Sequence, residues 1–547
     1  MDREDLSETI IQEVSAIVAE ELRAAGPELL TADLDGMEAR LQAVSRRVCG
    51  ATLERVLAVR AAPRGERPPC PVCGGLLRLV AQARGRNLQE LTGDATMVRP
   101  TYVCTRAGCG QGHAPLDAEL GLGAETLTPR LARVVCRAGI TGAFDAAAAQ
   151  GAEDHGVVVG GETARGVTEA VGAVAEAAQQ DEVARARRGA LTRPGGGARD
   201  MVVAVDGCQA PLRDGWHEVK VGRAAPLGPA TRTDRRVGRT DLAWGTAAIC
   251  AGLEGAEDCW WRVAVTAWRA GLGQQTRRVV VLGDGAEWIW NRAAHVLGGP
   301  GVAVVEVLDI FHAYEHLWDA GRAAFAPPEA RAAWAAPLED ALYEGGAPAV
   351  LDALDALAAR PLELAAAEAL RRARAYVADN AARLDYPRFV AQQLPIGSGA
   401  VESLCKTLIE ARAKGAGMRW TRAGLQAVAT LRAVRASGDG AAFWAAHPLR
   451  ARLRLRPLAR PRRRASAGAP TQETQPAAPP PPPPQRPQRN RPRPPSRPPR
   501  PRRRSPPIPL PRRAAPPPRT CGGTHPSGAP AVPDPLTIVG HAPALAT

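Results

Sequence analysis

Four cysteines in the first quarter of the chain stand in two closely spaced pairs. Cys70 and Cys73 lie on the turn PCPVCGG, and Cys104 and Cys109 form a second pair after 30 intervening residues. Two such turns can place four thiolates tetrahedrally around Zn²⁺, and a site closed by four protein ligands is structural rather than catalytic. The spacing therefore predicts one structural Zn²⁺. His113, four residues past Cys109, is an alternative to one of the thiolates.

Three carboxylates are candidates for a second metal site, although no local spacing connects them. Asp206 ends the apolar run MVVAVD, Asp284 ends RRVVVLGD, and Glu402 follows a Gly-Ser-Gly turn. The carboxyl ends of neighbouring strands in an α/β sheet share one crevice, and a helix across it can add a third acid. Three acids can hold two Mg²⁺ or Mn²⁺ ions about 3.5–4 Å apart around a scissile phosphate. Both aspartates precede glycine, which is also typical of an ordinary turn, so the prediction depends on all three acids together.

The elements that must position these carboxylates are buried strands. Near-continuous runs of β-branched residues are typical of strands covered on both faces of a sheet. The order of the runs predicts a mixed α/β sheet with helices on its faces, and the Ala-, Leu- and Arg-rich residues 325–392 predict an all-helical insertion. The strands are expected at 201–206, 217–222, 246–253, 260–265, 277–284 and 302–309.

Helices and a small β-unit are expected before this sheet. Apolar residues recur at spacings of three, four and seven in residues 5–24 and 37–60, which predicts two amphipathic helices. The cysteine segment 68–116 has the alternating, turn-rich pattern of short strands. Residues 127–180 are again helical and fit a helix-turn-helix, with a candidate recognition helix starting at Glu162 that would use Arg165 to contact DNA. Any three-helix bundle would give the same pattern.

Changes in composition divide the chain into five regions. They are an N-terminal helical region (1–66), a zinc ribbon (67–117), a helix-turn-helix-like region (125–182), an α/β domain (198–450) and an Arg/Pro-rich tail (455–547).

Net charge is concentrated in one of these regions. The chain has a formal net charge of +14, but residues 1–446 have 50 basic and 54 acidic side chains. Residues 447–547 hold 20 arginines, no lysine and two acids, and a segment so rich in proline and charge is expected to be disordered. The tail fits either a nonspecific DNA-binding arm or a shifted reading frame through GC-rich DNA. The sequence contains no uncharged apolar run of about 20 residues, so no membrane span is predicted. The polar, acidic start MDREDLSETI predicts a cytoplasmic protein.

Taken together, these motifs resemble a known family. The two cysteine pairs, VAVDG, VVLGDGAEWIW, LDIFHAYEHLW and GSGAVESLCK with GAGMRWTRAGLQAVATLRA resemble the transposases of bacterial insertion sequences of the ISKra type. That family is related to Mutator-like transposases, which have a ribonuclease-H-like DDE core. The resemblance covers residues 5–450 and gives no reason for the tail.

The resemblance implies a catalytic role for specific residues. Asp206 and Asp284 correspond to the two catalytic aspartates and Glu402 to the glutamate, while Asp309 and His312 match the D-x-x-H motif of the clan. The implied activity is metal-dependent cleavage at the ends of the element, followed by attack of the freed 3′-hydroxyl on target DNA. The implied partner is double-stranded DNA, as terminal inverted repeats and target, bound by a homodimer or larger assembly.

Basic and aromatic residues after Glu402 are candidates for DNA contact. Lys406 lies one turn beyond Glu402 on the same predicted helix face, and the other candidates follow within the next 14 residues. Each could instead belong to a solvated charged face or, for the tryptophan, to the core. The further candidates are Arg412, Lys414, Arg419 and Trp420.

Two other functions remain compatible with this sequence. One is a ribonuclease-H-like nuclease that cuts DNA without joining it. The other is a catalytically inactive DNA-binding protein that keeps the zinc ribbon. The presence of all three carboxylates favours an active enzyme over the second of these.

Overall fold

The structure is a computed structural model that describes residues 3–61, 68–122, 126–228, 230–234, 239–242 and 247–446. By internal contacts the chain divides into Met1–Arg462 and Arg463–Thr547, and the second part lies outside the described residues. The predicted Arg/Pro-rich tail at 455–547 therefore also lies outside them. None of the described helices has the length and apolar composition needed to cross a membrane.

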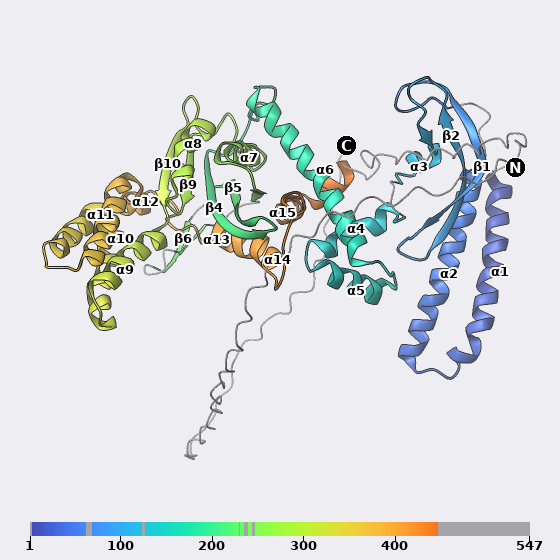
Figure 1. Cartoon of the computed structure of the whole chain (residues 1–547), viewed down its shortest axis with the longest axis horizontal. Coiled ribbons are helices and arrows are strands. Elements are labelled where there is room, and N and C mark those ends of the chain that lie inside the picture. The colour runs from blue at the N-terminus through green and yellow to red at the C-terminus, as the bar shows by residue number, and fades with distance from the viewer. Residues whose placement is uncertain are drawn as a thin grey trace, which may run out of the picture. The chain divides into compact units, whose positions relative to one another are not determined.

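The chain begins with two long helices that pair side by side (Figure 1). Helix α1 (Arg3–Leu29) is longer at both ends than the helix predicted at 5–24. Helix α2 (Leu34–Arg60) begins three residues before the helix predicted at 37–60. The Asp33 carboxylate accepts a hydrogen bond from the Gly36 amide, which caps the start of α2. Ion pairs cross between the helices in antiparallel order: Arg40–Glu28, Arg47–Glu21 and Arg55–Glu13.

A small antiparallel sheet follows, as the cysteine segment predicts. Strands β1 (Leu77–Leu88), β2 (Ala95–Cys104) and β3 (Gly112–His113) pair in the order β1-β2-β3. The short helix α3 (Pro115–Glu119) places Asp117 below this sheet, where its carboxylate accepts hydrogen bonds from Arg86 and Arg99.

Three helices occupy the helix-turn-helix-like region. They are α4 (Pro129–Gly139), α5 (Phe144–His155) and α6 (Gly161–Arg187). Their apolar faces share one core, to which Leu431 of a later helix also belongs. The end of α5 is a left-handed Gly156, the usual way for a helix to stop.

The α/β region is built on a five-stranded mixed sheet in the order β10-β9-β4-β5-β8 (Figure 1). Strands β4, β9 and β10 are parallel, whereas β5 is antiparallel to β4 and β8 is antiparallel to β5. Residues 230–234 and 239–242 form a separate two-stranded ribbon, β6 and β7. The sheet strands are β4 (Asp200–Leu212), β5 (Gly215–Pro226), β8 (Ala248–Gly252), β9 (Arg278–Gly283) and β10 (Ala303–Leu308).

Alternate residues of the parallel strands enter two different cores. Val203, Val205 and Val281 face one core, which α7 (Ala256–Arg269) and α8 (Glu287–Leu297) cover. Val202 and Val280 face the other core, which the later helices cover. Both sides of the sheet are therefore buried, which explains why its strands are uniformly apolar.

One predicted strand is wrong. Residues 260–265 (WWRVAV) lie inside helix α7, not in a strand. The side chains buried against the sheet lie at positions i, i+3, i+4 and i+7, the pattern of one helix face. They are Trp260, Val263, Ala264 and Ala267. The β-branched composition of a short run obscured this periodicity.

Helices fill residues 310–391, as expected for the predicted insertion at 325–392. The Ser-Gly turn after them leads to α13 (Gly399–Leu404) and then to a π-helix, η2 (Cys405–Glu410), in which the chain makes wider turns. The helices before the turn are α9 (Ile310–Ala324), α10 (Pro328–Ala358), α11 (Leu364–Asp379), the short 3₁₀ helix η1 (Ala381–Arg383) and α12 (Tyr386–Ala391). Those after η2 are α14 (Ala411–Ala413), α15 (Arg422–Ala436) and α16 (Gly440–Ala446).

Candidate functional site

The four predicted zinc ligands come together in the small antiparallel sheet. The sulfur atoms of Cys70, Cys73, Cys104 and Cys109 all lie within 4.8 Å of one another. The Cys70–Cys109 sulfur separation is 3.9 Å and the Cys73–Cys104 separation is 3.5 Å. Zn–S bonds of about 2.3 Å in a tetrahedron require sulfurs about 3.8 Å apart. These thiols can therefore hold a metal such as zinc.

Backbone amides converge on the same sulfur atoms. The amides of Val72 and Cys73 are directed at the Cys70 sulfur, and the Gly75 amide at the Cys73 sulfur. The hydrogen bond from Gly75 is the largest effect that lowers the pKa of Cys73, to about 7. Because metal binding requires thiolates, these amides favour the form that binds. Glycine is needed at position 75, since a β-carbon there would lie 2.9 Å from the Arg106 β-carbon and 3.3 Å from the Cys104 sulfur.

His113 contacts the cluster but does not replace one of its cysteines. Its Nε2 atom is 3.2 Å from the Cys70 sulfur. The side chain is buried, and its Nδ1 atom has no hydrogen-bond partner among the described residues. The short strand β3, which pairs His113 with Tyr102, holds it in this place. His113 therefore supports one ligand rather than completing the set.

The second candidate site lies where the parallel pairing of β4, β9 and β10 ends. Strand β4 itself continues to Leu212, so it does not end at Asp206 as the sequence predicted. Strand β4 pairs with β9 so that Ala204 is opposite Leu282. Two residues further on, the same register places Asp206 level with Asp284. Strand β9 pairs with β10 so that Gly283 is opposite Leu308, which places Asp284 level with Asp309. Three aspartates thus occupy one level of three adjacent strands.

All three aspartates also belong to the same side of the sheet. Asp206 follows Val202 and Ala204 in the alternation of β4, and both of those side chains face the core under α9 and the later helices. Leu282 and Val307 face the same core, two residues before Asp284 and Asp309 respectively. The sheet therefore gathers three acids along one edge, although 78 and 25 residues separate them in sequence.

Asp206 is held in a setting that opposes its charge. Burial is the largest effect that raises its pKa, and the nearby carboxylate of Asp284 raises it further. Its own carboxylate accepts a hydrogen bond from the Gly207 amide, and the Cys405 thiol of η2 also contacts it. A buried carboxylate beside a second one would be stabilised by a cation.

Asp284 is positioned by the turn that follows β9. Its carboxylate accepts a hydrogen bond of 2.9 Å from the Ala286 amide, and Gly285 has a positive φ of 97°. Tyr376 of α11 donates its hydroxyl hydrogen to the Asp284 carbonyl oxygen at 3.3 Å. The helical insertion therefore contacts the loop that carries Asp284.

Asp309 is almost fully buried and acts as a hydrogen-bond acceptor within the protein. Its carboxylate caps α9 by accepting from the amides of Phe311 and His312, and it also accepts from the amide and the hydroxyl of Ser398. It thereby ties the end of β10 to the turn before α13. Despite burial, the pKa of Asp309 is lowered by His312 and Ser398.

His312 stands on the first turn of α9 beside this carboxylate. Its Nδ1 atom lies 3.8 Å from the Asp309 carboxylate, which is an ion-pair distance rather than a hydrogen bond. The Asp309 side chain is the largest effect that raises the pKa of His312, to about 9, and the charge of Asp284 adds to it. His312 is therefore a cation at neutral pH, at the same sheet edge as the aspartates.

Glu402 comes to this edge on α13, which packs against β4 and β5. It lies one turn before Cys405, the residue that contacts Asp206. Its carboxylate is exposed and pairs with Lys406 at 2.6 Å. Among the described residues, the four cysteines have all their ligand atoms within 4.8 Å of one another. No set of carboxylates in the same residues meets this criterion.

Two of the residues predicted to contact DNA are in the interior instead. Arg412 is 3% exposed and donates two hydrogen bonds to the Gly139 carbonyl at the end of α4. Trp420 is 6% exposed and its indole donates to the Ala413 carbonyl. The guanidinium of Arg412 lies over the rings of Phe144 and Trp420. These contacts give both residues a packing role, which is the alternative noted from the sequence.

The other predicted cations keep part of their surface exposed. Lys406 pairs with Glu402, and Lys414 pairs with Glu410 at 2.5 Å. Arg419 is exposed and donates only to the neighbouring Met418 carbonyl among the described contacts.

Arg165, the candidate base contact of the predicted recognition helix, is held by two acids on its own helix. It pairs with Glu162 and with Glu169. The exposed positions of α6 next to Arg165 carry small uncharged residues such as Gly166 and Ala170. This face therefore lacks free cations near its start.

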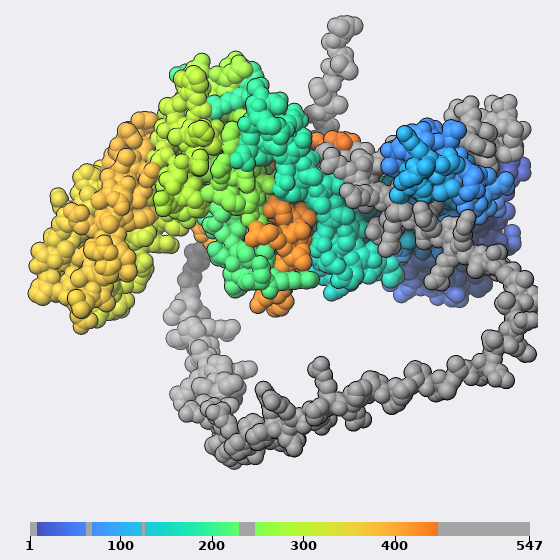
Figure 2. All heavy atoms as spheres, turned by 45° about the horizontal axis from the view of Figure 1, so that its top comes forward, coloured from blue at the N-terminus to red at the C-terminus, as the bar shows by residue number. Residues whose placement is uncertain are grey.

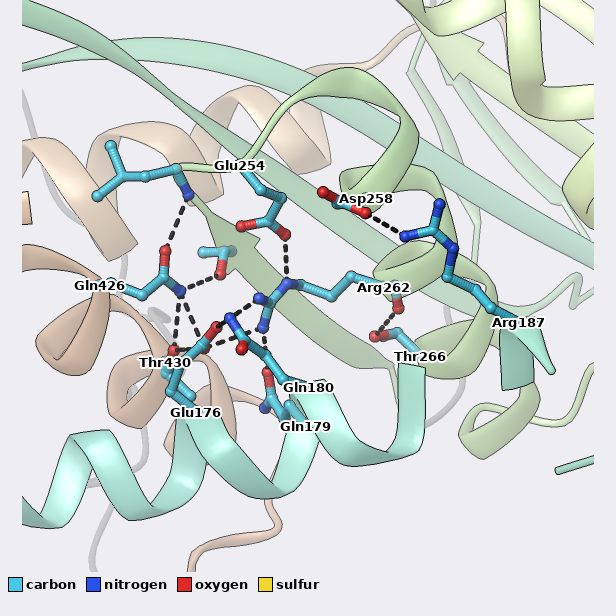
Figure 3. Close-up of polar contacts among 12 residues, drawn as sticks. Glu176, Gln179, Gln180, Arg187, Glu254, Asp258, Arg262, Thr266, Gln426 and Thr430 are labelled. Atoms are coloured by element: carbon cyan, nitrogen blue, oxygen red, sulfur yellow. Dashed lines mark hydrogen bonds and ion pairs between the residues drawn. The ribbon is translucent and has the colours of Figure 1, made fainter. Parts of the chain in front are cut away.

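Helix α6 is also joined to the sheet region by a buried polar network (Figure 3). Arg262 of α7 pairs with Glu176 of α6 and with Glu254, and Glu176 also accepts from Gln426 and Thr430 of α15. Gly172 packs against the Ala427 backbone so closely that a β-carbon would lie 2.4 Å from its oxygen. Helix α6 is thus a structural strut between the two regions.

Sequence reasoning missed several residues at the sheet edge. Ser398 was seen only as part of a turn, and Tyr376 only as part of the helical insertion. Trp216, near the tip of the β4–β5 hairpin, is 60% exposed and lies 6.0 Å from the Lys414 ammonium. A glycine-flanked tryptophan in the sequence DGWHE was the available signal for it.

Comparison with models of known protein families gave no match, and no curated protein matched the chain. The geometry of the two sites is therefore the basis for the functional argument.

Proposed function

We propose that this chain is a DNA transposase that cleaves DNA at the ends of an insertion sequence and joins the freed ends to target DNA. The supporting observation is the common level of Asp206, Asp284 and Asp309 on three adjacent strands, at the point where their parallel pairing ends. Ligands and catalytic groups collect at this edge in open α/β sheets. The proposal includes a ribonuclease-H-like assignment of the mixed sheet.

In this proposal Asp206, Asp284 and Glu402 hold Mg²⁺ or Mn²⁺. Their oxygen donors suit these ions, and burial, followed by the charge of Asp284, raises the pKa of Asp206, an effect that a bound cation would oppose. Bound there, the metal would activate the attacking oxygen and stabilise the leaving oxygen of a phosphodiester. To bind the metal together with Asp206 and Asp284, Glu402 must release Lys406. The freed Lys406 ammonium could then bind a phosphate.

Asp309 and His312 position the other groups. Asp309 fixes α9 and the Ser398 turn, so it orients the start of α13 toward the sheet edge. His312 carries a positive charge in the same place and can donate a hydrogen bond to a phosphate oxygen from Nε2. The Cys₄ cluster holds one structural Zn²⁺ and shapes the N-terminal region for DNA binding. Two copies of the chain would hold the two terminal inverted repeats.

The test is a strand-transfer assay with labelled duplexes that carry the DNA flanking the gene, in the presence of Mg²⁺ or Mn²⁺. Asp206→Asn, Asp284→Asn and Glu402→Gln are each expected to remove cleavage and leave DNA binding unchanged. Asp319→Asn is the matched control, because Asp319 is an exposed acid on α9 that pairs with Arg322. Full activity of any of the three variants would remove that residue from the site.

The same assay separates the proposal from its alternatives. Cleaved but unjoined ends would identify a nuclease that lacks strand transfer. Bound but intact ends in every metal condition would identify a DNA-binding protein without catalysis.

A further inference from the structure

Helix α4 exposes a row of arginines on the side opposite its core face. Arg130, Arg133 and Arg137 recur at spacings of three and four, so they lie on one helix face, and all three are exposed. Leu131 and Val135 on the other side are buried against α6. Helix α4 is therefore amphipathic, with arginines on its exposed face and buried apolar side chains on the opposite face.

Helix α15 adds further arginines at the end of α4. Arg432 donates hydrogen bonds to the carbonyls of Ile140, Leu408 and Thr407, and the exposed Arg435 donates to the Thr141 hydroxyl at 3.0 Å. In Figure 2 the segment after residue 400 (orange) lies directly against the helices of the 130–180 region (teal). The same Thr141 hydroxyl donates to the Arg137 carbonyl at 2.9 Å, so the arginines of the two segments adjoin at this end of α4. We define the α4–α15 arginine surface as Arg130, Arg133, Arg137, Arg432 and Arg435.

Elsewhere on the described surface, exposed arginines commonly pair with acids. Arg322 pairs with Asp319, Arg371 with Glu368, and Arg374 with Asp355. Within the described part of the chain, no ion pair involves any member of the α4–α15 arginine surface.

The arginines at this place also repel one another. The pKa of Arg432 is lowered by burial first and then by the charge of Arg435. The pKa of the neighbouring Arg412 is lowered to about 10, again by burial first and then by the charge of Arg432. No acid contributes to either effect. Like charges gathered without a counter-ion favour the binding of a polyanion.

We propose that the α4–α15 arginine surface binds the phosphate backbone of double-stranded DNA without reading its sequence. This inference rests on the proposed function for its choice of polyanion. Arg130 and Arg137 are about 10 Å apart along the helix axis, a length equal to the axial rise of about three nucleotides of one DNA strand. Guanidinium groups suit phosphate because they can donate two parallel hydrogen bonds to it. Arg133 is additionally held in place over the Trp444 ring.

The experiment measures binding of the full chain to a fluorescent 30-base-pair duplex of arbitrary sequence as a function of KCl concentration. The test variant is Arg130→Gln/Arg133→Gln/Arg137→Gln. The matched control is Arg322→Gln/Arg371→Gln/Arg374→Gln, which removes the same charge from arginines that pair with acids. Any contribution of residues 447–547 is common to all three proteins and cancels in the comparison.

The test variant is expected to reduce the slope of log affinity against log salt concentration by about 2.7, because each phosphate contact contributes about 0.9. Between 50 and 200 mM KCl the wild-type affinity should therefore fall about 40-fold more than that of the variant. A second duplex of unrelated sequence should give the same change. Unfolding midpoints of the three proteins serve to show that all are folded.

Several outcomes would overturn the inference. One is an unchanged slope in the test variant, and another is an equal change in the control. A wild-type protein that binds an acidic peptide but not duplex DNA would assign the surface to a protein partner instead. Failure of the proposed function is distinguishable, because duplex binding with the expected slope but without cleavage contradicts only the catalytic proposal.

Discussion

The cysteine cluster and the carboxylate edge are both candidate metal sites, but they are assembled in opposite ways. The cysteines lie on two short turns of one small sheet, and all four sulfurs are within 4.8 Å of one another. The carboxylates come from strands and a helix up to 196 residues apart in the chain, and Glu402 pairs with Lys406 instead of joining the aspartates. The first site has its ligand geometry in the protein alone, whereas the second requires a rearrangement of at least one side chain.

This difference follows from how each site satisfies its charge. Backbone amides favour the thiolates of Cys70 and Cys73, whereas burial and the neighbouring thiols raise the pKa values of Cys104 and Cys109. At the sheet edge, burial and the charge of Asp284 raise the pKa of Asp206, and the compensating cations are the side chains of His312 and Lys406. Metal loss should therefore unfold the first region and leave the second folded.

The largest expected effect is that of removing two zinc ligands. Cys73→Ser/Cys104→Ser should abolish bound zinc and unfold the small sheet, because a structural zinc site contributes on the order of 10 kcal/mol to folding. Metal analysis and hydrogen exchange of residues 68–122 measure the two results. Cys49→Ser is the control, since Cys49 is outside the cluster. Retention of one zinc per chain by the double variant would contradict the assignment.

The second effect concerns the carboxylate that ties the sheet edge together. Asp309→Ala should lower the free energy of unfolding by about 3 kcal/mol, because it removes the cap of α9 and leaves the buried Ser398 amide and hydroxyl without their acceptor. Denaturant unfolding measures this change. Asp319→Ala, at an exposed position of the same helix, should change stability by less than about 0.5 kcal/mol. Equal effects would show that Asp309 has no special structural role.

The same contrast explains what the sequence could predict. Cysteine spacing is a local property, so all four ligands were predicted correctly as a cluster. Long apolar runs predicted the strands β4, β9 and β10, and Asp284 and Asp309 directly follow two of them, but β4 continues past Asp206 to Leu212. Their common level depends on strand register, which no local pattern contains, and the role of Ser398 depends on a contact across 89 residues.

Errors arose where composition and packing disagreed. Residues 260–265 are apolar and β-branched, but helical packing against the sheet decides their structure. Arg412 and Trp420 have the residue types expected of a DNA surface, yet the end of α4 and the ring of Phe144 cover them. Burial of this kind is set by long-range packing, which the sequence of one segment cannot indicate.

A smaller effect would sharpen the account of the cysteine cluster. Gly75→Ala should destabilise the protein by about 1–2 kcal/mol and speed the release of zinc to a chelator, because the new methyl group crowds Arg106 and the Cys104 sulfur. Gly85→Ala is the control, since no atom lies within 4 Å of its added β-carbon. Identical zinc release in the two variants would show that the cluster tolerates displacement.

The smallest effect is a pH dependence that only the carboxylate edge should have. The folded-state pKa of His312 is raised to about 9, above the unfolded value of about 6.5. Its charge therefore stabilises the folded protein fully below about pH 6.5, and this contribution is lost as the pH rises through about 9. Because His312 is one-third exposed and 3.8 Å from Asp309, we expect a contribution of about 1 kcal/mol.

Denaturant unfolding of wild type and His312→Gln at pH 6 and pH 10 measures this contribution. The variant should be less stable than wild type by about 1 kcal/mol at pH 6 and nearly equal to it at pH 10. A difference that stays constant over this range would show that His312 stabilises the edge through packing and not through charge. The acids of this edge would then lack a protonated histidine as counter-ion, and Lys406, which pairs with Glu402, would balance them before metal binds.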